Sequence, residues 1–427
     1  MKMKETKFLI IGAGISGLTV ANCLNKDADY LIIEKEKEIG GLCRTFNIAG
    51  YIWDFAGHFY HFKTEEMKKL FMEKMKDEEI VYKTKNTKIY YNGRMIDYPF
   101  QTNIHQLDKE EFIDCLYDLY NKEESEEYNS FLDMLYGKFG KSITEKFLKP
   151  YNEKLYACNL TSLDKDAMGR FFPYADIKEI INNMKENKSN SYNNTFLYPK
   201  RGAVAFLEKL NKGIDNERLM LNEEVKEIDI EKKIVTLKNG KSIKYEYLIN
   251  TIPFNKFLET MKIDYKKIVT ELSYNQVLVF NLGFEKKSEN KEHWIYFPDK
   301  KINFYRIGFY NNILDDEKMS LYVEIGFPKN EIIDINEQLE LTLENLKKIG
   351  IIQDNKLIAY NSLIINPGYV HINKKHIKEI ADLKEKLENK DIYTIGRYGN
   401  WTYCSMEDCM ISAKELAQRI ERKEVSK

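Results

Sequence analysis

The chain has few of the features that mark secreted, membrane-spanning or nucleic-acid-binding proteins. Its six cysteines, in 427 residues, include no C-x-x-C pair, which argues against a structural zinc site and a disulfide framework. No apolar run reaches about 18 residues, so we expect no membrane-spanning helix. The 66 basic and 67 acidic side chains almost cancel, and a net charge of −1 gives no global attraction to nucleic acid or anionic membranes. No signal peptide is recognisable, so we expect a cytoplasmic protein, and we expect no metal ion.

The composition is that of an ordinary folded protein. Apolar residues make up 43% of the chain and charged residues 31%, which excludes a disordered chain. At roughly 100–200 residues per domain, the length favours two or three domains. We find no internal repeat and no low-complexity segment.

The first forty residues carry a dinucleotide-binding pattern. The apolar run Phe8–Ile11 predicts a buried parallel strand, and a glycine turn and a helix-spaced segment follow at once. A second apolar strand then ends at Glu34. Gly12 permits the tight turn, Gly14 lets the backbone approach a pyrophosphate, and Gly17 lets helix and strand pack closely. Glu34 can accept hydrogen bonds from a ribose, so we predict that this unit binds a dinucleotide.

Two later motifs distinguish between the dinucleotides. Gly40-Gly41-Leu42-Cys-Arg44 and Ala-Gly57-His58 follow the acid, and Gly396-Arg397 comes near the C-terminus. This order resembles the FAD-containing clan of amine oxidases and UDP-galactopyranose mutases. The resemblance implies FAD and places His58 against its isoalloxazine ring, although His58 alone could equally be a buried structural imidazole. We expect the FAD to be non-covalent, because no His or Cys flanks the motifs in a flavin-linking pattern. The implied cofactor-binding residues are Gly12, Gly14, Ser16, Gly17, Glu34, Lys35, Gly41, Leu42, Arg44, Gly57, His58, Val225 and Arg397.

Further stretches, in order along the chain, resemble the UDP-galactopyranose mutase family, closest to its fungal and protozoan type. They include Tyr98-Pro-Phe100-Gln101, Lys149-Pro-Tyr-Asn152, Phe304-Tyr-Arg306, Pro367-Gly-Tyr369 and Trp401-Thr-Tyr403. An aromatic face and an amide suit a nucleobase, and guanidinium forks with phenols suit a diphosphate. The implied substrate-binding residues are Tyr98, Phe100, Gln101, Asn152, Tyr156, Asn193, Tyr296, Tyr369 and Tyr403. The implied catalytic residues are Arg306, Arg170 and His58.

The chain departs from the family pattern at two places. Tyr156 stands where the family has tryptophan, and the stretch Cys404–Cys409 replaces a segment that meets flavin and sugar in the family. The stretch Cys404–Cys409 is more similar to the broader amine-oxidase clan. Both departures leave the identity of the sugar open.

We expect an α/β fold with a Rossmann-like FAD-binding domain, an inserted helical domain and an antiparallel-sheet substrate domain. The predicted boundaries are 1–60, 195–252 and 388–427 for the FAD domain, 105–194 for the helical domain, and 61–104 and 253–387 for the sheet domain. Local patterns predict helices over 65–76, 336–349 and 408–422 and a hairpin turn at Asn92-Gly93. Asp108 and Glu111 have the spacing of a capping box at the start of another helix.

The resemblance implies a redox-neutral mutase that interconverts the pyranose and furanose forms of a UDP-sugar, with a role in cell-surface polysaccharide synthesis. Reduced FAD would attack the anomeric carbon and displace UDP, and NADPH or NADH could reduce it. An FAD-dependent oxidoreductase of the amine-oxidase or protoporphyrinogen-oxidase type is the first alternative, because it would share the three glycine motifs. A nucleotide-binding protein without catalysis is the second. The sequence leaves the oligomeric state and the reductant open.

Overall fold

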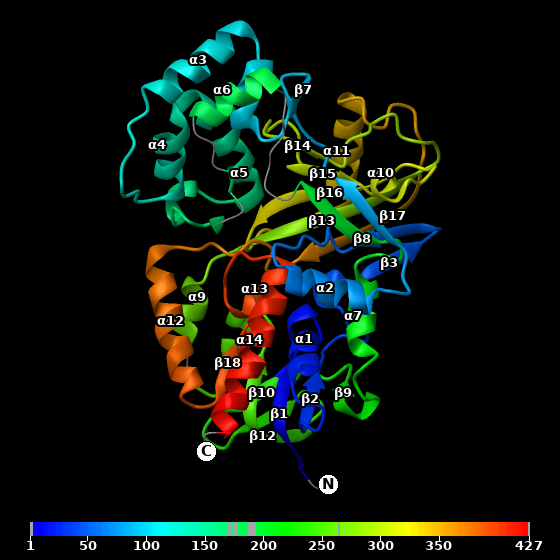
Figure 1. The fold of residues 1–427 in the computed structure, drawn as a ribbon, viewed down its shortest axis with the longest axis vertical. Coiled ribbons are helices and arrows are strands. Elements are labelled where there is room, and N and C mark those ends of the chain that lie inside the picture. The colour runs from blue at the N-terminus through cyan, green and yellow to red at the C-terminus, as the bar shows by residue number, and fades with distance from the viewer. Residues whose placement is uncertain (1–2, 170–171, 174–176, 187–193, 264, 426–427) are drawn as a thin grey trace.

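A computed structural model describes residues 3–169, 172–173, 177–186, 194–263 and 265–425. These residues form a parallel-stranded sheet with helices on both faces, a second and largely antiparallel sheet, and a group of helices beside the second sheet (Figure 1). Strand β1 begins and helix α14 ends at the foot of the first sheet, as Figure 1 shows. The predicted α/β class is confirmed.

The first sheet collects seven strands from distant parts of the chain. They are β1 (Lys4–Ile11), β2 (Tyr30–Ile33), β9 (Leu219–Met220), β10 (Val225–Asp229), β11 (Ile234–Leu237), β12 (Ser242–Asn250) and β18 (Ile392–Thr394). Their order is β10-β11-β12-β1-β2-β9, and β18 pairs with the second half of β12. All pairs are parallel except those that β11 makes with β10 and β12. The dinucleotide unit is therefore at the centre of this sheet.

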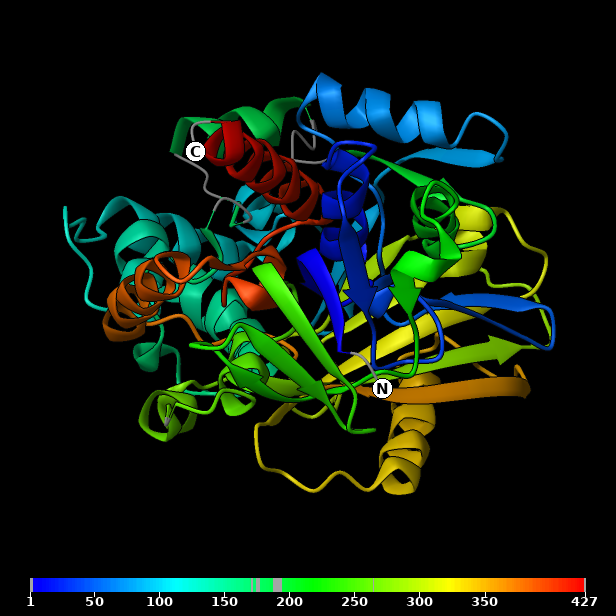
Figure 2. The same ribbon diagram turned by 90° about the horizontal axis from the view of Figure 1, so that it is seen from below.

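Alternate residues of β1 explain why both faces of the sheet are covered. Phe8 and Ile10 pack toward α1 and α14, which lie together on one side of β1 in Figure 2. Leu9 and Ile11 pack on the opposite face against α8 and α12. The bounds of these helices are α1 (Ile15–Cys23), α8 (Phe254–Glu259), α12 (Lys374–Glu388) and α14 (Met406–Val425). Each buried side chain of this size contributes about 1.5–3 kcal/mol to stability.

The second sheet has the order β17-β13-β16-β15-β14-β6-β7. Its strands are β6 (Thr87–Tyr91), β7 (Arg94–Asp97), β13 (Asn275–Phe284), β14 (Trp294–Tyr296), β15 (Arg306–Phe309), β16 (Ser320–Pro328) and β17 (Leu357–Ile365). Neighbours are antiparallel except β14 and β6. Leu278 and Phe280 of β13 face a core closed by α11 (Ile335–Lys348), whereas Val277 and Val279 belong to the core on the other face. Because α11 covers one face of the second sheet, it is the opposite face that is directed toward the first sheet.

A helical group lies beside the second sheet. It comprises α3 (Lys109–Tyr120), α4 (Phe131–Ile143), a π-helical turn (Thr144–Leu148), α5 (Lys149–Tyr156) and α6 (Ile177–Glu186). The predicted capping box of α3 is wrong. Asp108 makes no cap hydrogen bond and instead pairs with Arg94 at 2.6 Å, while Glu111 accepts a hydrogen bond from Tyr91 at 2.7 Å. Partners from the β6–β7 hairpin thus outcompete the local cap.

The other elements connect these parts. They are α2 (Glu65–Lys74), α7 (Val204–Asn211), α9 (Lys266–Glu271), α10 (Tyr310–Leu314), α13 (Gly396–Gly399), β3 (Thr45–Ile48), β4 (Tyr51–Asp54), β5 (Ile80–Thr84) and β8 (Thr195–Pro199). The predicted helices and the Asn92-Gly93 hairpin are present to within a few residues. All six cysteines are free.

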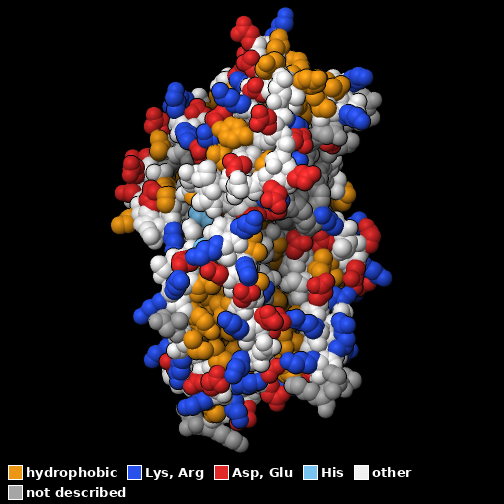
Figure 3. All heavy atoms as spheres, turned by 90° about the vertical axis from the view of Figure 1, so that its left-hand side faces the viewer, with side chains coloured by type: hydrophobic (Ala, Val, Ile, Leu, Met, Phe, Trp, Pro, Cys, Tyr) orange, Lys and Arg blue, Asp and Glu red, His pale blue; other side chains and the backbone are white. Residues whose placement is uncertain are grey.

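The surface carries both signs of charge. On the face in Figure 3, acidic and basic side chains are intermingled over its whole height. No described helix combines the length and the apolar character that crossing a membrane requires.

Candidate cofactor and substrate site

A cavity of about 700 Å³ is lined by loops that follow strands of the first sheet, by strands of the second sheet and by the helical group. This size is typical of a site that encloses a small molecule or cofactor. Most of the predicted site residues lie on this wall. They are Gly12, Gly14, Ser16, Glu34, Lys35, Gly41, Leu42, Arg44, Gly57, His58, Tyr98, Gln101, Asn152, Tyr296, Arg306, Tyr369, Arg397 and Tyr403.

Two glycine turns face each other at one end of the cavity. A Cβ atom on Gly41 would lie 3.3 Å from the Cα atom of Gly14, so side chains here would narrow the passage between the turns. Gly12 has a φ of +103°, which side chains rarely adopt. A Cβ atom on Gly17 would lie 2.0 Å from the carbonyl oxygen of Gly12. The glycines therefore keep a bare backbone where α1 begins, and the first-turn amides of that helix are suited to a phosphate.

Glu34 directly follows β2 and is only 8% exposed. One carboxylate oxygen accepts the N–H of Ala13 at 2.8 Å, and the other accepts the N–H of Glu36 at 3.0 Å. The carboxylate therefore ties the glycine turn to the end of β2. It lines the cavity as well, so its remaining lone pairs are available to a ribose hydroxyl.

Arg44 closes the second glycine turn. Its Nε donates to the carbonyl of Gly41 at 3.0 Å, and its guanidinium lies 4.2 Å from the ring centre of Phe55. Ion pairs to Glu36 and Glu38 at 3.4 and 3.5 Å complete its surroundings. Four contacts thus hold the side chain in one position, as is required of a residue that shapes a cofactor site.

His58 presents a neutral imidazole to the cavity. Burial lowers its pKa to about 4, and the positive charges of Arg397 and Arg306 act in the same direction. Nδ1 lies 2.9 Å from the carbonyl oxygen of Ala56, which assigns the ring proton to Nδ1. Nε2 is then a hydrogen-bond acceptor at neutral pH.

A row of polar side chains crosses three strands of the second sheet. Tyr296 pairs with Arg306, and Arg306 pairs with Glu324, in the registers of β14, β15 and β16. Nε and Nη2 of Arg306 each donate to a different oxygen of Glu324 at 2.8 Å. Glu324 is 2% exposed, whereas Arg306 is 22% exposed and lines the cavity. The two-pronged pair fixes the guanidinium plane and leaves Nη1 for a ligand.

Arg397 lies nearby, with its guanidinium group among three tyrosine rings. Its guanidinium carbon lies 4.4 Å from the ring centre of Tyr403, 5.3 Å from that of Tyr369 and 5.7 Å from that of Tyr398. The rings of Tyr369 and Tyr403 are stacked at 5.8 Å. Nη1 donates to the carbonyl of Cys404 at 3.2 Å. Arg397, predicted as a cofactor contact, thus lies beside two of the predicted phosphate tyrosines.

Two buried amides lack part of their hydrogen bonding. Gln101 donates to the carbonyl of Pro173, and Asn152 donates to the carbonyl of Leu148 at 2.6 Å. The amide oxygens of both side chains are buried without a partner among the described residues, and so is the Tyr305 hydroxyl. Unpaired buried acceptors cost about 1–3 kcal/mol each, so these atoms indicate a ligand that donates hydrogen bonds.

Some predicted residues lie off the cavity wall. Phe100 is fully buried because its ring stacks on Phe147 at 5.1 Å, and Phe147 takes its place at the cavity. Tyr156 is 1% exposed and packs against the rings of Phe131 and Tyr369, and Val225 lies in β10. Gly17 is buried by its contact with Gly12. Arg170 and Asn193 lie outside the described residues.

Sequence reasoning missed three kinds of residue on the wall. Glu324 is invisible without the strand register. Phe147 has only helical spacing to mark it, although it stacks at 5.2 Å on Tyr151, the tyrosine of the Lys149-Pro-Tyr-Asn152 stretch. Lys85 lines the cavity with its ammonium 5.2 Å from the ring centre of Tyr98 and 5.6 Å from that of Trp294, with no motif to mark it.

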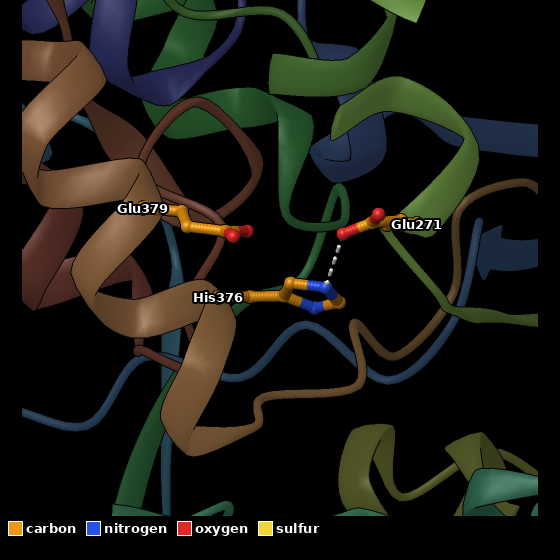
Figure 4. Close-up of side chains that lie close together, drawn as sticks. All are labelled: Glu271, His376 and Glu379. Atoms are coloured by element: carbon orange, nitrogen blue, oxygen red, sulfur yellow. Dashed lines mark ion pairs between the residues drawn. The ribbon is translucent and has the colours of Figure 1, made fainter. Parts of the chain in front are cut away.

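A separate cluster on the far side of the first sheet joins α9 to α12. Glu271, His376 and Glu379 place one ligand atom each within 4.8 Å of one another (Figure 4). Lys375 already pairs with Glu271 at 2.6 Å and with Glu379 at 3.8 Å. An ammonium therefore supplies the positive charge there, and the cluster links two helices.

A comparison with models of known protein families shows to which family the chain belongs. The family model described as flavin containing amine oxidoreductase matches residues 15–421. The chain belongs to this flavin-containing family. The glycine turns, the first-turn amides of α1 and the buried Glu34 carboxylate fit the dinucleotide part of FAD. The family would hold its cofactor at this end of the cavity.

Solved structures share the fold. A crystal structure of reduced UDP-galactopyranose mutase is similar with a TM-score of 0.91 and 24% identity, over 97% of this chain and 93% of that one. A putative protoporphyrinogen oxidase from Exiguobacterium sp. 255-15 is similar with a TM-score of 0.77 and 17% identity, over 99% and 100% of the two chains. The predicted likeness in fold to the mutase is confirmed, and flavin oxidases share the architecture.

Two curated proteins are each similar to this chain over 53 residues. An uncharacterized protein in the nifH2 3' region of Methanothermococcus thermolithotrophicus is 47% identical over 12% of this chain and 51% of its own length. The inactive all-trans-retinol 13,14-reductase of Danio rerio is 42% identical over 12% of this chain and 9% of its own. The match thus spans about half of one relative and less than a tenth of the other.

Proposed function

We propose that the protein is a flavin-dependent, redox-neutral mutase that interconverts the pyranose and furanose forms of a UDP-sugar, UDP-galactose or a close relative. One observation carries the proposal. Beyond the glycine turns, the same cavity holds two arginines among tyrosines and, on the helical side, buried amide oxygens without partners. A nucleoside diphosphate needs both kinds of group, whereas an amine substrate needs neither.

The diphosphate would lie against Arg306 and Arg397. Arg306 offers the Nη1 hydrogens that Glu324 does not use, in a plane that the ion pair has already set. Tyr296, Tyr369 and Tyr403 add phenol groups to the same part of the wall. Because Glu324 cancels one positive charge, the proposal assigns a further cation to this region. Arg170 is the predicted one.

The uracil would lie on the helical side. Gln101 and Asn152 present acceptors that suit the ring N–H of uracil, and both amides are held by backbone carbonyls. The stacked rings of Phe147 and Tyr151 provide an aromatic wall beside them. We propose that Phe147 acts at the cavity and that Phe100 supports it from behind.

Reduced FAD, when bound, supplies the nucleophile that displaces UDP from the sugar, and NADPH or NADH is the proposed reductant. The chain's own residues hold the leaving diphosphate and balance its charge. His58, as a neutral imidazole, offers Nε2 as an acceptor toward the reacting part of the cavity. The proposal includes a cytoplasmic enzyme whose product enters cell-surface polysaccharide synthesis.

The fold shared with reduced UDP-galactopyranose mutase supports this proposal. An FAD-dependent oxidoreductase is the second candidate, because the family model and the similarity to a putative protoporphyrinogen oxidase favour it. Two measurements on the purified holoprotein separate them. UDP binding by calorimetry, tighter than uridine, supports the mutase. Rapid oxygen consumption with an amine or a porphyrinogen, without UDP binding, supports the oxidoreductase.

A further inference from the structure

We propose that Cys404 and Cys409 form a redox-active dithiol that exchanges two electrons with the flavin bound in the same cavity. The inference rests on the flavin part of the proposed function and is independent of the sugar substrate. It gives a role to the segment Cys404–Cys409, at which the chain departs from the mutase family pattern.

The two thiols are held together where α14 begins. Their sulfur atoms lie 3.7 Å apart, and both residues line the cavity. Ser405 and Asp408 form a reciprocal cap between them: the N–H of Ser405 donates to the Asp408 carboxylate at 2.8 Å, and the N–H of Asp408 donates to the Ser405 hydroxyl at 3.1 Å. This cap fixes the backbone between the two thiols, and a disulfide would require their sulfur atoms to close from 3.7 Å to about 2.05 Å.

The surroundings favour thiol chemistry at Cys409. The hydrogen bond from Cys404 lowers the pKa of the Cys409 thiol, and the backbone N–H of Arg397 and the Ser16 hydroxyl add to the effect. A lowered thiol pKa favours the thiolate, which is the nucleophile in disulfide exchange. Ser16 lies in the first turn of α1, directly after the glycine turn, and lines the cavity. The dithiol therefore adjoins both the dinucleotide motif and Arg397.

A purely structural explanation also exists. Residues just before a helix cap often pack on the fourth helical residue, and Cys404 and Cys409 occupy those two positions. Apolar side chains would serve that purpose equally well. If the two cysteines only pack against each other, replacing them should not change the number of electrons that the protein takes up per flavin. This number therefore distinguishes the two explanations.

The proposed step balances. Oxidation of the two thiols forms one sulfur–sulfur bond and releases two electrons and two protons, which is the amount that reduces one oxidised flavin by two electrons. An external dithiol then reduces the disulfide by exchange and restores both thiols. The pair would thus give the reduced flavin a source of electrons within the same cavity.

The first test uses peptide mass. The holoprotein is treated with oxidised dithiothreitol, alkylated and digested with trypsin. Cleavage after Arg397 and Lys414 releases one peptide that contains Cys404 and Cys409 and no other cysteine. We expect this peptide to escape alkylation and to be lighter by two hydrogen atoms. A fully alkylated peptide, or a disulfide that uses Cys43 instead, would overturn the proposal.

The second test counts electrons. The oxidised holoprotein is titrated with dithionite without oxygen while the visible absorbance of the flavin is followed. We expect the parent to consume twice as much dithionite per flavin as the double variant Cys404→Ser, Cys409→Ser. Cys158→Ser, which removes a half-buried thiol away from the cavity wall, should behave as the parent. Equal consumption by parent and double variant would overturn the proposal.

The peptide test keeps the inference falsifiable if the double variant misfolds, since it needs only the parent. A protein that binds no flavin would contradict the proposed function itself. A flavoprotein without the disulfide would overturn this inference alone.

Discussion

Arg306 is the residue on which the diphosphate site most depends, and Glu324 decides how it can be tested. Replacing Arg306 by Ala would leave a carboxylate that is 2% exposed without its partner, at a cost of about 3–5 kcal/mol. Lys keeps a positive charge opposite Glu324 but cannot make a planar, two-pronged contact. Arg306→Lys is therefore the sharper variant.

We expect Arg306→Lys to weaken UDP binding about 10- to 150-fold, because a hydrogen bond to a charged group contributes about 1.5–3 kcal/mol. Calorimetric titration of UDP into parent and variant measures the change. Uridine, which lacks phosphates, serves as the control and should bind both proteins alike, and the flavin content should be equal. An unchanged affinity for UDP would make Arg306 a structural partner of Glu324 alone.

His293 predicts a pH dependence of stability. It is 7% exposed, its Nδ1 accepts the N–H of Asn86 at 3.0 Å, and burial lowers its pKa to about 4. In the unfolded chain the pKa of this imidazole is near 6.5. At a pH between the two pKa values, the imidazole is therefore protonated in the unfolded state and neutral in the folded state. The free energy of unfolding therefore falls as the pH drops from about 6.5 toward 4.

The matched variant is His293→Gln, whose amide oxygen can accept the same N–H and does not titrate. We expect its Tm to fall less than that of the parent between about pH 7 and pH 5. Thermal unfolding followed by circular dichroism at both pH values measures the difference. An identical fall in the two proteins would show that His293 titrates freely.

Single residues also show where sequence reasoning ends. Arg306 and Tyr296 could be selected because their local motifs carry them. Glu324 could not, because its contact with Arg306 depends on the register of two strands 18 residues apart. Phe100 was placed at the nucleobase although Phe147 covers it, and that stacking joins a loop to a helical turn that no local pattern connects.

The β1–α1 unit gives a prediction about a whole element. A Cβ atom at position 17 would lie 2.0 Å from the Gly12 carbonyl oxygen, so Gly17→Ala must push α1 away from the turn. We expect a loss of about 1–3 kcal/mol and a lower flavin content, because the first-turn amides of α1 move with the helix. Thermal unfolding and the ratio of flavin to protein absorbance measure both effects.

Gly213→Ala is the control for this variant. Its nearest neighbour would be 3.7 Å from the new Cβ atom, which is ordinary contact. We expect no loss of stability or flavin there. If Gly17→Ala behaves like Gly213→Ala, the helix tolerates the shift and the close-packing role of Gly17 is refuted.

Elements with strong local signals were predictable. The apolar run before the glycines gave β1, and helical spacing gave α11 within one residue at each end. The cap of α3 was not predictable, since Arg94 and Tyr91 reach Asp108 and Glu111 from the neighbouring hairpin. Local spacing cannot weigh such tertiary partners.

For the molecule as a whole, the order of motifs predicted the architecture better than periodicity did. Strands from residues 4–33, 219–250 and 392–394 share one sheet, and we propose that they form the core of one discontinuous cofactor domain. Only the placement of the glycine motifs at both ends of the chain suggested this. The pairing of β14 with β6, which joins the two segments of the proposed substrate domain, had no signal in either strand alone.

Family membership leads to a prediction about the cofactor. We expect non-covalent FAD, because the chain has no flavin-linking pattern of His or Cys around its glycine motifs. Acid precipitation should release the yellow colour into the supernatant, where chromatography identifies FAD. Colour that stays with the pellet would show a covalent flavin.

We expect that a cavity with sites for both a flavin and a nucleoside diphosphate rearranges a sugar ring without net oxidation. The most direct measurement incubates the dithionite-reduced holoprotein with UDP-galactopyranose and other UDP-hexoses and reads the ring form of the product by chromatography and NMR. We predict that at least one UDP-hexopyranose equilibrates with its furanose form while the flavin stays reduced, and that the unreduced protein is inactive. Unchanged UDP-hexoses throughout the panel, together with amine-dependent or porphyrinogen-dependent oxygen consumption, would refute the mutase activity and favour an oxidoreductase.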